Sequence, residues 1–353
     1  MAALLKEIEL VEDFFPAAKG SAGMVETIYF GGGTPSLCTR EEIDAVLREI
    51  KTRFVVSSGA EITLEANPDD ISAEKLQQWK DSGINRLSIG IQSFFADDLA
   101  WMNRAHDSDQ AWSSLLLATR YFENITVDLI YGTPGLSDEN WKQNVDRVIS
   151  LAIPHISCYA LTVEPQTPLQ KLIREHKAAD INPDFQSEQF LLLMKWLGEA
   201  GYEHYEISNF ARPGFRSRHN SSYWQGKPYF GFGPSAHSFD GASRWWNIAN
   251  NTRYIRSIEN GTIPFEREEL TPVQQINERI MISLRTMEGL NTNRLIHEIK
   301  GIGEDEVMQM KQALLEASAG YIKNGLMVRE GDRLMLTKEG KLLADGIAAD
   351  LFF

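Results

Sequence analysis

The chain has 353 residues, of which 43% are hydrophobic, and this is long enough for one large domain and a smaller one. Its 49 acidic side chains outnumber the 35 basic ones and give a net charge of −14, so the chain repels phosphate backbones and we expect no nucleic acid among its partners. No stretch approaches the ~20 consecutive apolar residues of a membrane span, and the first residues lack the pattern of a signal peptide. With only two cysteines, Cys38 and Cys158, the composition favours a reducing, cytoplasmic location.

Short apolar segments rich in β-branched residues alternate with helical patterns along the first half of the chain. We predict strands at 25–30, 61–66, 86–92, 125–131 and 155–163. Amphipathic patterns between them predict helices at 39–54, 72–83, 107–122 and 137–152. Three of these helices begin with a residue typical of an N-cap: Thr39, Ser72 and Ser137.

This alternation predicts an α/β fold. The strands begin about 25 to 40 residues apart, which is the size of one βα unit, so we expect a parallel sheet with helices outside it. An open doubly wound sheet and a full or partial (β/α) barrel both fit, and both bind ligands at the C-terminal ends of their strands. Glu65, Gln92 and Asp128 lie at or near predicted strand ends. We therefore expect the ligand site at this edge of the sheet.

The second half of the chain is organised differently. A helix is predicted at 183–201, followed by a strand and then a loop up to Trp224. Beyond Thr262, a helical pattern, a hairpin around "EGD" and a final helix suggest a small α+β module that is winged-helix-like. We therefore expect two domains, 1–261 and 262–353. Because the second is rich in acids, a packing or partner role is favoured over DNA binding.

Four polar residues and a glycine run are candidates for the binding site. Gly31 to Gly33 follow the first predicted strand, where their backbone could approach a ligand closely. The run matches neither a Walker A loop nor the G-x-G-x-x-G dinucleotide pattern. Glu65, Gln92, Arg104 and Asp128 come from successive βα units. Carboxylates accept hydrogen bonds from ribose or ammonium groups and arginine pairs with carboxylates, so this set suits a ligand with a sugar and an amino acid zwitterion.

Several segments carry a resemblance to a known family: "ETIYFGGGTPSL", "LEANPDD", "GINRLSIGIQSF", "MNRAH", "VDLIYGTPG" and "YEISNFARPGFRSRHNSSYW". Over nearly its whole length the chain resembles the radical S-adenosylmethionine superfamily. Within it, the chain is most similar to the oxygen-independent coproporphyrinogen III oxidases and their HemW-type haem-chaperone relatives. The resemblance implies an α/β fold, namely a partial (β/α)6 TIM-like barrel lacking its first strand, followed by the small winged-helix-like domain.

The resemblance also implies a binding site for S-adenosylmethionine. The glycine-rich loop matches the segment that holds the amino acid part of this cofactor, and Glu65 and Arg104 match residues that hold its amino and carboxylate groups. Gln92 and Asp128 match ribose contacts. Ala160 and His237 match residues that line the adenine. The matching positions are Gly32, Gly33, Thr34, Glu65, Gln92, Arg104, Asp128, Ala160 and His237.

The iron–sulfur cluster of the family raises a separate expectation. Its motif, Cys-x3-Cys-x2-Cys, precedes the helix with which this chain begins, and the sequence contains no such motif. Cys38 and Cys158 lie on different βα units without that spacing, whereas a cluster needs about four thiolates, or three and a substrate. We expect no cluster and no radical chemistry from the chain as printed, and a 4Fe–4S cluster only in a full-length form with the motif.

One further motif resembles the haem-binding segment of the chaperone branch. His219, Asn220, Tyr223 and Trp224 read H-N-x-x-Y-W. An imidazole can ligate haem iron, and aromatic rings can flank a porphyrin. His219 is therefore a candidate iron ligand. Its competitors are His204, His237 and Cys158.

The resemblance implies a haem chaperone that binds haem and S-adenosylmethionine and delivers haem to client proteins such as respiratory enzymes. Two alternatives stay open. One is an oxygen-independent coproporphyrinogen III oxidase of porphyrin biosynthesis, which would need the cluster. The other is an interaction protein without a cluster, which would bind neither haem nor S-adenosylmethionine. The H-N-x-x-Y-W pattern favours the chaperone, and a homodimer is one assembly that the sequence leaves open.

Overall fold

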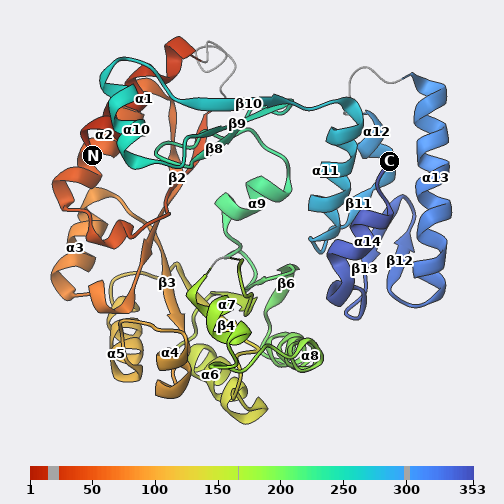
Figure 1. Cartoon of the computed structure of the whole chain (residues 1–353), viewed down its shortest axis with the longest axis horizontal. Helices are drawn as coiled ribbons and strands as arrows, with labels where there is room; N and C mark the ends of the chain where they lie inside the picture. Colours follow the sequence, from red (N-terminus) through yellow and green to blue (C-terminus); the bar gives the residue numbers. More distant parts are fainter. Residues whose placement is uncertain (15–23, 166, 298–302) are drawn as a thin grey trace.

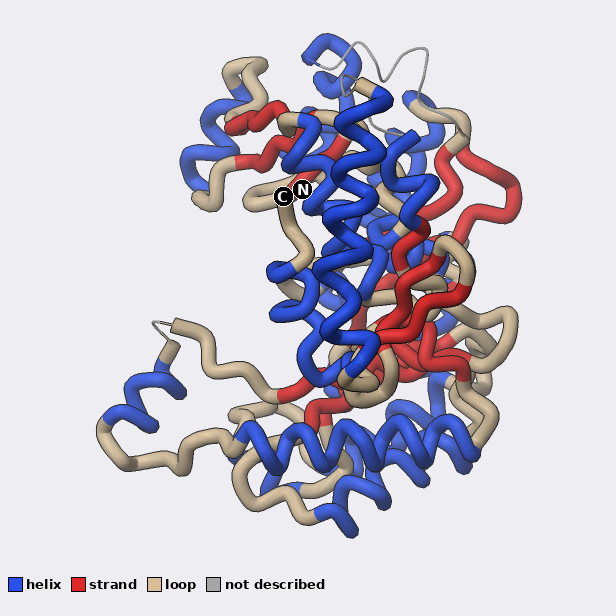
Figure 2. Tube along the Cα trace, turned by 90° about the vertical axis from the view of Figure 1, so that its right-hand side faces the viewer, coloured by secondary structure: helices blue, strands red, loops and turns tan. Residues whose placement is uncertain are grey.

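The computed structural model describes residues 1–14, 24–165, 167–297 and 303–353. Its centre is a seven-stranded sheet with the strand order β1-β2-β3-β4-β5-β7-β6. Figures 1 and 2 show how this sheet curls. The first five strands pair in parallel, which confirms the α/β half-barrel. Their bounds are β1 Val25–Phe30, β2 Val56–Ala66, β3 Arg86–Gln92, β4 Ile125–Tyr131 and β5 His155–Ala160.

The helices between these strands pack on the outside of the sheet, as predicted. They are α2 Arg40–Arg53, α3 Ala73–Ser82, α4 Ala96–Trp101, α5 Ser108–Ala118 and α6 Asp138–Ser150, with short 3-10 helices at η2 Pro35–Leu37 and η3 Pro68–Asp70. All three predicted N-caps form, because Thr39, Ser72 and Ser137 each accept a backbone hydrogen bond from the first helical turn. The apolar helix faces are buried against the sheet, with Trp79 and Trp141 among the largest buried side chains.

The end of the sheet differs from a run of parallel strands. The chain crosses from β5 through α7 (Pro168–Arg174) and α8 (Pro183–Glu199) to β6 (Glu203–Glu206) and β7 (Asn209–Ala211). These two strands form a hairpin, and β7 pairs with β5 in antiparallel orientation. Only Ile207 and Ser208 separate β6 from β7. Two residues are enough for a hairpin but not for the helical crossover that parallel pairing needs. Helix α9 (Arg218–Trp224) then forms where a loop was predicted.

A second, three-stranded sheet follows α9 in the chain. It joins β8 (His237–Phe239), β9 (Ser243–Asn247) and β10 (Phe265–Glu269) in antiparallel order, with α10 (Asn251–Glu259) beside it. Helix α1 (Ala2–Phe14) is tied to this region through the buried carboxylate of Glu7, which accepts hydrogen bonds from the Gly233 N–H, the Asn247 side chain and the Tyr254 hydroxyl. The boundary that we predict between residues 261 and 262 stays a prediction. Strand β10 lies beyond this boundary and pairs with β9, which lies before it.

The C-terminal part has its own hydrophobic core. Ile280 of α11, Leu314 of α13 and Leu334 of β13 lie buried in it, and the β12–β13 hairpin falls at the predicted "EGD" turn. Among the helices in the described ranges, none is both long and apolar enough to cross a membrane. The elements are α11 Pro272–Leu284, β11 Leu290–Asn291, α12 Thr292–His297, α13 Glu304–Lys323, β12 Met327–Glu330, β13 Arg333–Leu336, η4 Gly340–Leu343 and α14 Ala344–Asp350.

Candidate functional site

A cavity of about 230 Å³ lies at the C-terminal ends of β1 to β4, and we call it the strand-end cavity. The parallel strands bring their ends to the same edge of the sheet, so side chains from successive βα units meet there. Most of the lining is polar. It consists of Gly33, Thr34, Pro35, Ser36, Glu65, Ala66, Asn67, Ser88, Gly90, Gln92, Arg104 and Asp128.

Two structural features explain why three consecutive glycines follow β1. Gly32 and Gly33 adopt positive φ angles of 74° and 65°, a region that favours glycine. At Gly31, a Cβ atom would lie 2.5 Å from the ring of Tyr29 and 3.1 Å from Glu65 Oε1. The turn also places the Gly32 N–H 3.2 Å from Glu65 Oε2, to which it donates. The glycine loop therefore lies directly against the carboxylate of Glu65.

Arg104 and Gln92 converge on the cavity over another glycine. A Cβ atom at Gly90 would lie 3.0 Å from Gln92 Nε2 and 3.6 Å from an Arg104 nitrogen, so glycine leaves the end of the Gln92 side chain more room. Gln92 itself has a φ of 66°, next to an irregularity in the β3–β4 pairing, which re-aims its side chain. Arg104 donates one hydrogen bond to Asn67 at 3.1 Å, but its Nε is buried with no partner in the described residues.

Two carboxylates shape the electrostatics of the strand-end cavity. Burial raises the pKa of Asp128 to about 7, and repulsion from Glu65 adds to the shift. Ser88 donates a hydrogen bond to Asp128 at 3.3 Å. The Arg104 nitrogen without a partner can donate a hydrogen bond to an anion. The neighbouring carboxylates of Glu65 and Asp128 favour a cation close to that anion. These groups fit a ligand that carries both an ammonium and a carboxylate.

The structure brings most of the predicted cofactor residues together. Gly32 joins them through its bond to Glu65, whereas Ala160 lies at the end of β5 outside the lining, and His237 lines a different cavity. Ser88 and Gly90 were missed, although they are two residues apart on β3 and strand periodicity places them on the same face. The predicted residues that line the cavity are Gly33, Thr34, Glu65, Gln92, Arg104 and Asp128.

A second cavity of about 260 Å³ lies between α9, the β8–β9 strands and α11, and we call it the α9 cavity. Figure 1 places α9 between the large sheet and α11, so this cavity joins the two halves of the molecule. Tyr223 and Trp224 of the H-N-x-x-Y-W motif line it, together with His237. The remaining lining residues are Gly226, Lys227, Tyr229, Phe239, Gly241, Arg244, Gln275, Glu278, Arg279 and Ile282.

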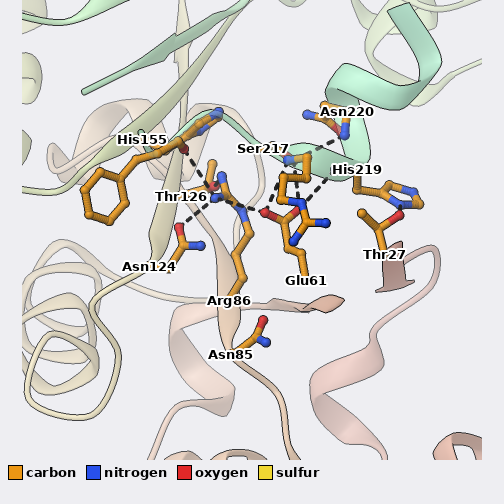
Figure 3. Close-up of polar contacts among 12 residues, drawn as sticks. Thr27, Glu61, Asn85, Arg86, Asn124, Thr126, His155, Ser217, His219 and Asn220 are labelled. Carbon is orange, nitrogen blue, oxygen red and sulfur yellow. Dashed lines mark hydrogen bonds and ion pairs between the residues drawn. The ribbon is translucent and has the colours of Figure 1, made fainter. Parts of the chain in front are cut away.

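A buried ion pair holds the beginning of α9 (Figure 3). Glu61 on β2 accepts backbone hydrogen bonds from Arg218 at 3.2 Å and from His219 at 3.0 Å. Arg86 on β3 lies 3.8 Å from the same carboxylate, and both side chains are almost fully buried. Arg86 also donates to the side chains of Asn124 and Thr126, each at 2.6 Å. Long-range polar contacts thus position the motif helix.

The predicted haem residues are only partly oriented toward the α9 cavity. His219 is bonded at both ring nitrogens, at 2.9 Å to the Thr27 hydroxyl and at 3.0 Å to the Tyr223 hydroxyl. Burial lowers its pKa to about 4, so the imidazole is neutral at physiological pH. Asn220 bonds through its backbone N–H to Ser217 (Figure 3). The ring of Trp224 lies 5.2 Å from the Arg285 guanidinium, and its indole N–H has no partner within the described residues.

The competing iron ligands differ in their availability. His204 stacks on Phe210 and is bonded at both nitrogens, to the Ile207 carbonyl at 2.9 Å and to Lys341 at 3.0 Å. Burial lowers its pKa to about 3. Cys158 is buried, and burial raises the pKa of its thiol well above the usual range. His237, by contrast, is exposed at the start of β8 and lines the α9 cavity.

The residues of this chain do not fit an iron–sulfur cluster. Cys158 is buried in the core, and Cys38 is partly buried at the end of η2 and is not part of the strand-end lining. Within the described ranges, no group of three or more His, Cys, Asp or Glu side chains is placed to hold a metal ion.

Comparisons with known proteins identify the family. Residues 4–148 match the Radical SAM superfamily. The chain is 34% identical to a heme chaperone HemW of Mycobacterium tuberculosis, over 99% of this chain and 85% of that relative. It is 33% identical to the heme chaperone HemW of Bacillus subtilis, over 94% and 86% of the two chains. Among solved structures, coproporphyrinogen III oxidase (HemN) from Escherichia coli, a Radical SAM enzyme, matches with a TM-score of 0.80 at 23% identity, over 99% of this chain and 82% of that one. This chain belongs to the HemW family of the Radical SAM superfamily.

Proposed function

We propose that this protein is a haem chaperone that binds haem at the α9 cavity and S-adenosylmethionine at the strand-end cavity, and passes haem to client proteins. The main observation behind this proposal is that Tyr223 and Trp224 of the H-N-x-x-Y-W motif line the same cavity as His237. The relatives named heme chaperone HemW, which align with most of the chain, support the same function.

The chemistry of the α9 cavity suits a porphyrin edge. Its volume of about 260 Å³ is just below the range of about 300–1,000 Å³ that is typical of ligand pockets. Aromatic rings offer faces to the macrocycle, and the cations Lys227 and Arg244 lie in the lining to meet propionates. Both cations already have carboxylate partners. Lys227 pairs with Glu26 at 2.8 Å, and Arg244 pairs with Glu268 at 2.9 Å and Glu278 at 3.3 Å. A propionate would compete with these carboxylates.

Two histidines are candidates for the iron ligand within this proposal. His237 is exposed and lines the α9 cavity. His219 lies at the other side of Tyr223, and its Nε2 must exchange the Tyr223 hydroxyl for iron before it can ligate. We therefore propose His219 as a ligand only in a haem-bound state in which Tyr223 has moved.

The strand-end cavity would hold S-adenosylmethionine through the groups described above. Arg104 would pair with the methionine carboxylate, and Glu65 would accept from its ammonium. Gln92 and Asp128 lie in the same lining, where they would meet the ribose. When bound, this molecule would bring a sulfonium cation into a cavity that already contains two carboxylates.

A haemin titration followed by absorbance tests the proposal. We expect saturable binding of about one haemin per chain, weakened by His219→Ala or His237→Ala according to which imidazole ligates the iron. His176→Asn is the matched control, because His176 is exposed, has a φ of 55° that asparagine tolerates, and lies outside the lining. Absence of saturable binding to the unmodified protein would overturn the proposal, and normal binding by both alanine variants would move the site away from the α9 cavity.

The same titration separates the alternatives. A coproporphyrinogen III oxidase is the second candidate function, and the similarity to HemN at 23% identity supports the fold alone. An interaction protein without ligands predicts no binding of haemin or S-adenosylmethionine. A cytoplasmic location belongs to the chaperone proposal and is supported by the two free cysteines. Respiratory proteins are its proposed clients.

A further inference from the structure

A chain of contacts connects the strand-end cavity to the α9 cavity through Tyr29. The Tyr29 hydroxyl donates to Oε1 of Glu65, a residue that lines the strand-end cavity, at 2.7 Å. The Tyr29 ring stacks on the ring of His219 with centroids 4.8 Å apart and planes inclined by 18°. His219 Nε2 is in turn 3.0 Å from the hydroxyl of Tyr223, which lines the α9 cavity. One aromatic side chain thus touches a lining residue of the first cavity and the motif histidine next to the second.

The position of Tyr29 is narrowly defined by its surroundings. Gly31 makes room for its ring, because a Cβ atom there would lie 2.5 Å from it. Burial and the neighbouring Glu65 carboxylate raise the pKa of Tyr29 above its usual value, so the hydroxyl keeps its proton and acts as a donor to Glu65. The hydroxyl is therefore tied to Glu65 and the ring to His219.

His219 is equally constrained on the side of α9. Thr27 and Tyr29 are two residues apart on β1, so they lie on the same face of the strand, and both contact the imidazole (Figure 3 shows Thr27 beside His219). A neutral imidazole has one donor and one acceptor nitrogen, and both are already used. A change in the position of the Tyr29 ring must therefore change the stack, the two hydrogen bonds of His219, or both.

We propose that Tyr29 is a positioning residue that couples the two cavities. A ligand that binds Glu65 through an ammonium group then changes the affinity of the α9 cavity for haem. This inference rests on the proposed function. Glu65 already accepts from Tyr29 at Oε1 and from the Gly32 N–H at Oε2. An ammonium that binds the same carboxylate competes with the Tyr29 hydroxyl, and the ring transmits the displacement to His219. By thermodynamic linkage, haem then changes the affinity of the ammonium ligand by the same factor.

The test compares haemin affinity with and without saturating S-adenosylmethionine in three proteins. In the unmodified protein we expect the two dissociation constants to differ by about fivefold or more, within the usual range of coupling between sites. In Tyr29→Phe, which keeps the ring but lacks the hydroxyl, the ratio should approach one. Tyr321→Phe is the matched control, because it also removes a tyrosine–carboxylate hydrogen bond, to Asp350, far along the chain from either cavity lining. Its ratio should equal that of the unmodified protein.

A second readout keeps this inference separate from the proposed function. If the unmodified protein fails to bind haemin, the chaperone proposal fails, and the ring ¹⁵N resonances of His219 then report the coupling without haem. We expect S-adenosylmethionine to shift these resonances in the unmodified protein and to leave them in place in Tyr29→Phe. Haemin affinity that is independent of S-adenosylmethionine, an unchanged ratio in Tyr29→Phe, failure of S-adenosylmethionine to bind, or His219 resonances that do not respond would each overturn the coupling.

Discussion

The strand-end cavity and the α9 cavity are assembled in opposite ways. The first takes its polar groups from consecutive βα units, within residues 33–128, at one edge of a parallel sheet. The second gathers residues 223–282 from α9, two strands of another sheet and α11. Repeated topology places the first set, whereas tertiary contacts between unlike elements place the second. A local sequence pattern therefore locates the first cavity much better than the second.

The two cavities also differ in how their polar groups are satisfied. In the strand-end cavity, Arg104 has a buried nitrogen without a partner among the described residues, and Asp128 is crowded by Glu65. Beside the α9 cavity, both ring nitrogens of His219 are bonded, and the first N–H groups of α9 are bound by Glu61. The first cavity is therefore ready for a polar ligand, while the second must rearrange hydrogen bonds to use His219.

The largest effect should come from breaking the buried support of α9. Arg86→Ala leaves Glu61 buried without its cationic partner, and we expect the free energy of unfolding to fall by about 3–5 kcal/mol. Urea unfolding of the variant and the unmodified protein measures this difference. In the fraction that stays folded, haemin affinity should fall more than affinity for S-adenosylmethionine, because Glu61 positions α9 and does not line the strand-end cavity.

An exposed ion pair provides the control for this prediction. Lys177 lies 2.7 Å from Glu175, and its side chain is 65% exposed. Lys177→Ala should change the free energy of unfolding by less than about 1 kcal/mol, because surface pairs contribute little. Equal losses in the two variants would contradict the role that we assign to the buried pair.

A smaller effect is expected at the strand-end cavity. Arg104→Ala removes the donor that we assign to the carboxylate of S-adenosylmethionine. Hydrogen bonds to charged groups contribute about 1.5–3 kcal/mol, so the dissociation constant from calorimetry should rise roughly 10- to 150-fold. Haemin affinity measured without S-adenosylmethionine should stay unchanged.

Arg40→Ala is the matched control for Arg104→Ala. Arg40 pairs with Asp44 and Asp81 on the outer helices and lines neither cavity. It should leave both affinities unchanged. An unaltered dissociation constant in Arg104→Ala would remove this residue from the site, and a parallel loss of haemin affinity would mean that the two cavities are not separable.

The same contrast explains which features the sequence could predict. Strands 25–30, 86–92 and 125–131 were located with the bounds that the structure has, because short apolar segments rich in β-branched residues are local signals. Glu65 and Arg104 were placed in one cavity because parallel strands share an edge. Asn67 was missed, although it directly follows the end of β2 next to the predicted Glu65.

Helix α9 could not be predicted in this way. It has seven residues, which is too short to be stable by its own propensity. It forms where Ser217 caps it and where Glu61, more than 150 residues earlier in the chain, accepts its first N–H groups. The placement of His237 in the α9 cavity likewise depends on how the second sheet faces α11. No local pattern carries these long-range contacts.

The smallest expected effect is a pH dependence of opposite sign at the two sites. The pKa of Asp128 is raised from 3.8 to about 7, so its contribution to stability is complete below pH 3.8 and is lost as the pH rises to 7. The pKa of His219 is lowered from 6.5 to about 4, so its contribution is complete above pH 6.5 and is lost as the pH falls to 4. Between these values the two contributions oppose each other in the unmodified protein.

Single variants should expose each contribution. Asp128→Asn retains His219, so its free energy of unfolding should fall as the pH decreases from 6.5 to 4. His219→Gln retains Asp128, so its free energy of unfolding should instead fall as the pH increases from 4 to 7. Each change should be on the order of 1 kcal/mol, because partial exposure reduces the ~1.4 kcal/mol per pKa unit of a fully buried group. Groups distant from both positions titrate alike in the two variants, so stabilities that changed with pH in the same direction would contradict the opposite electrostatics of Asp128 and His219.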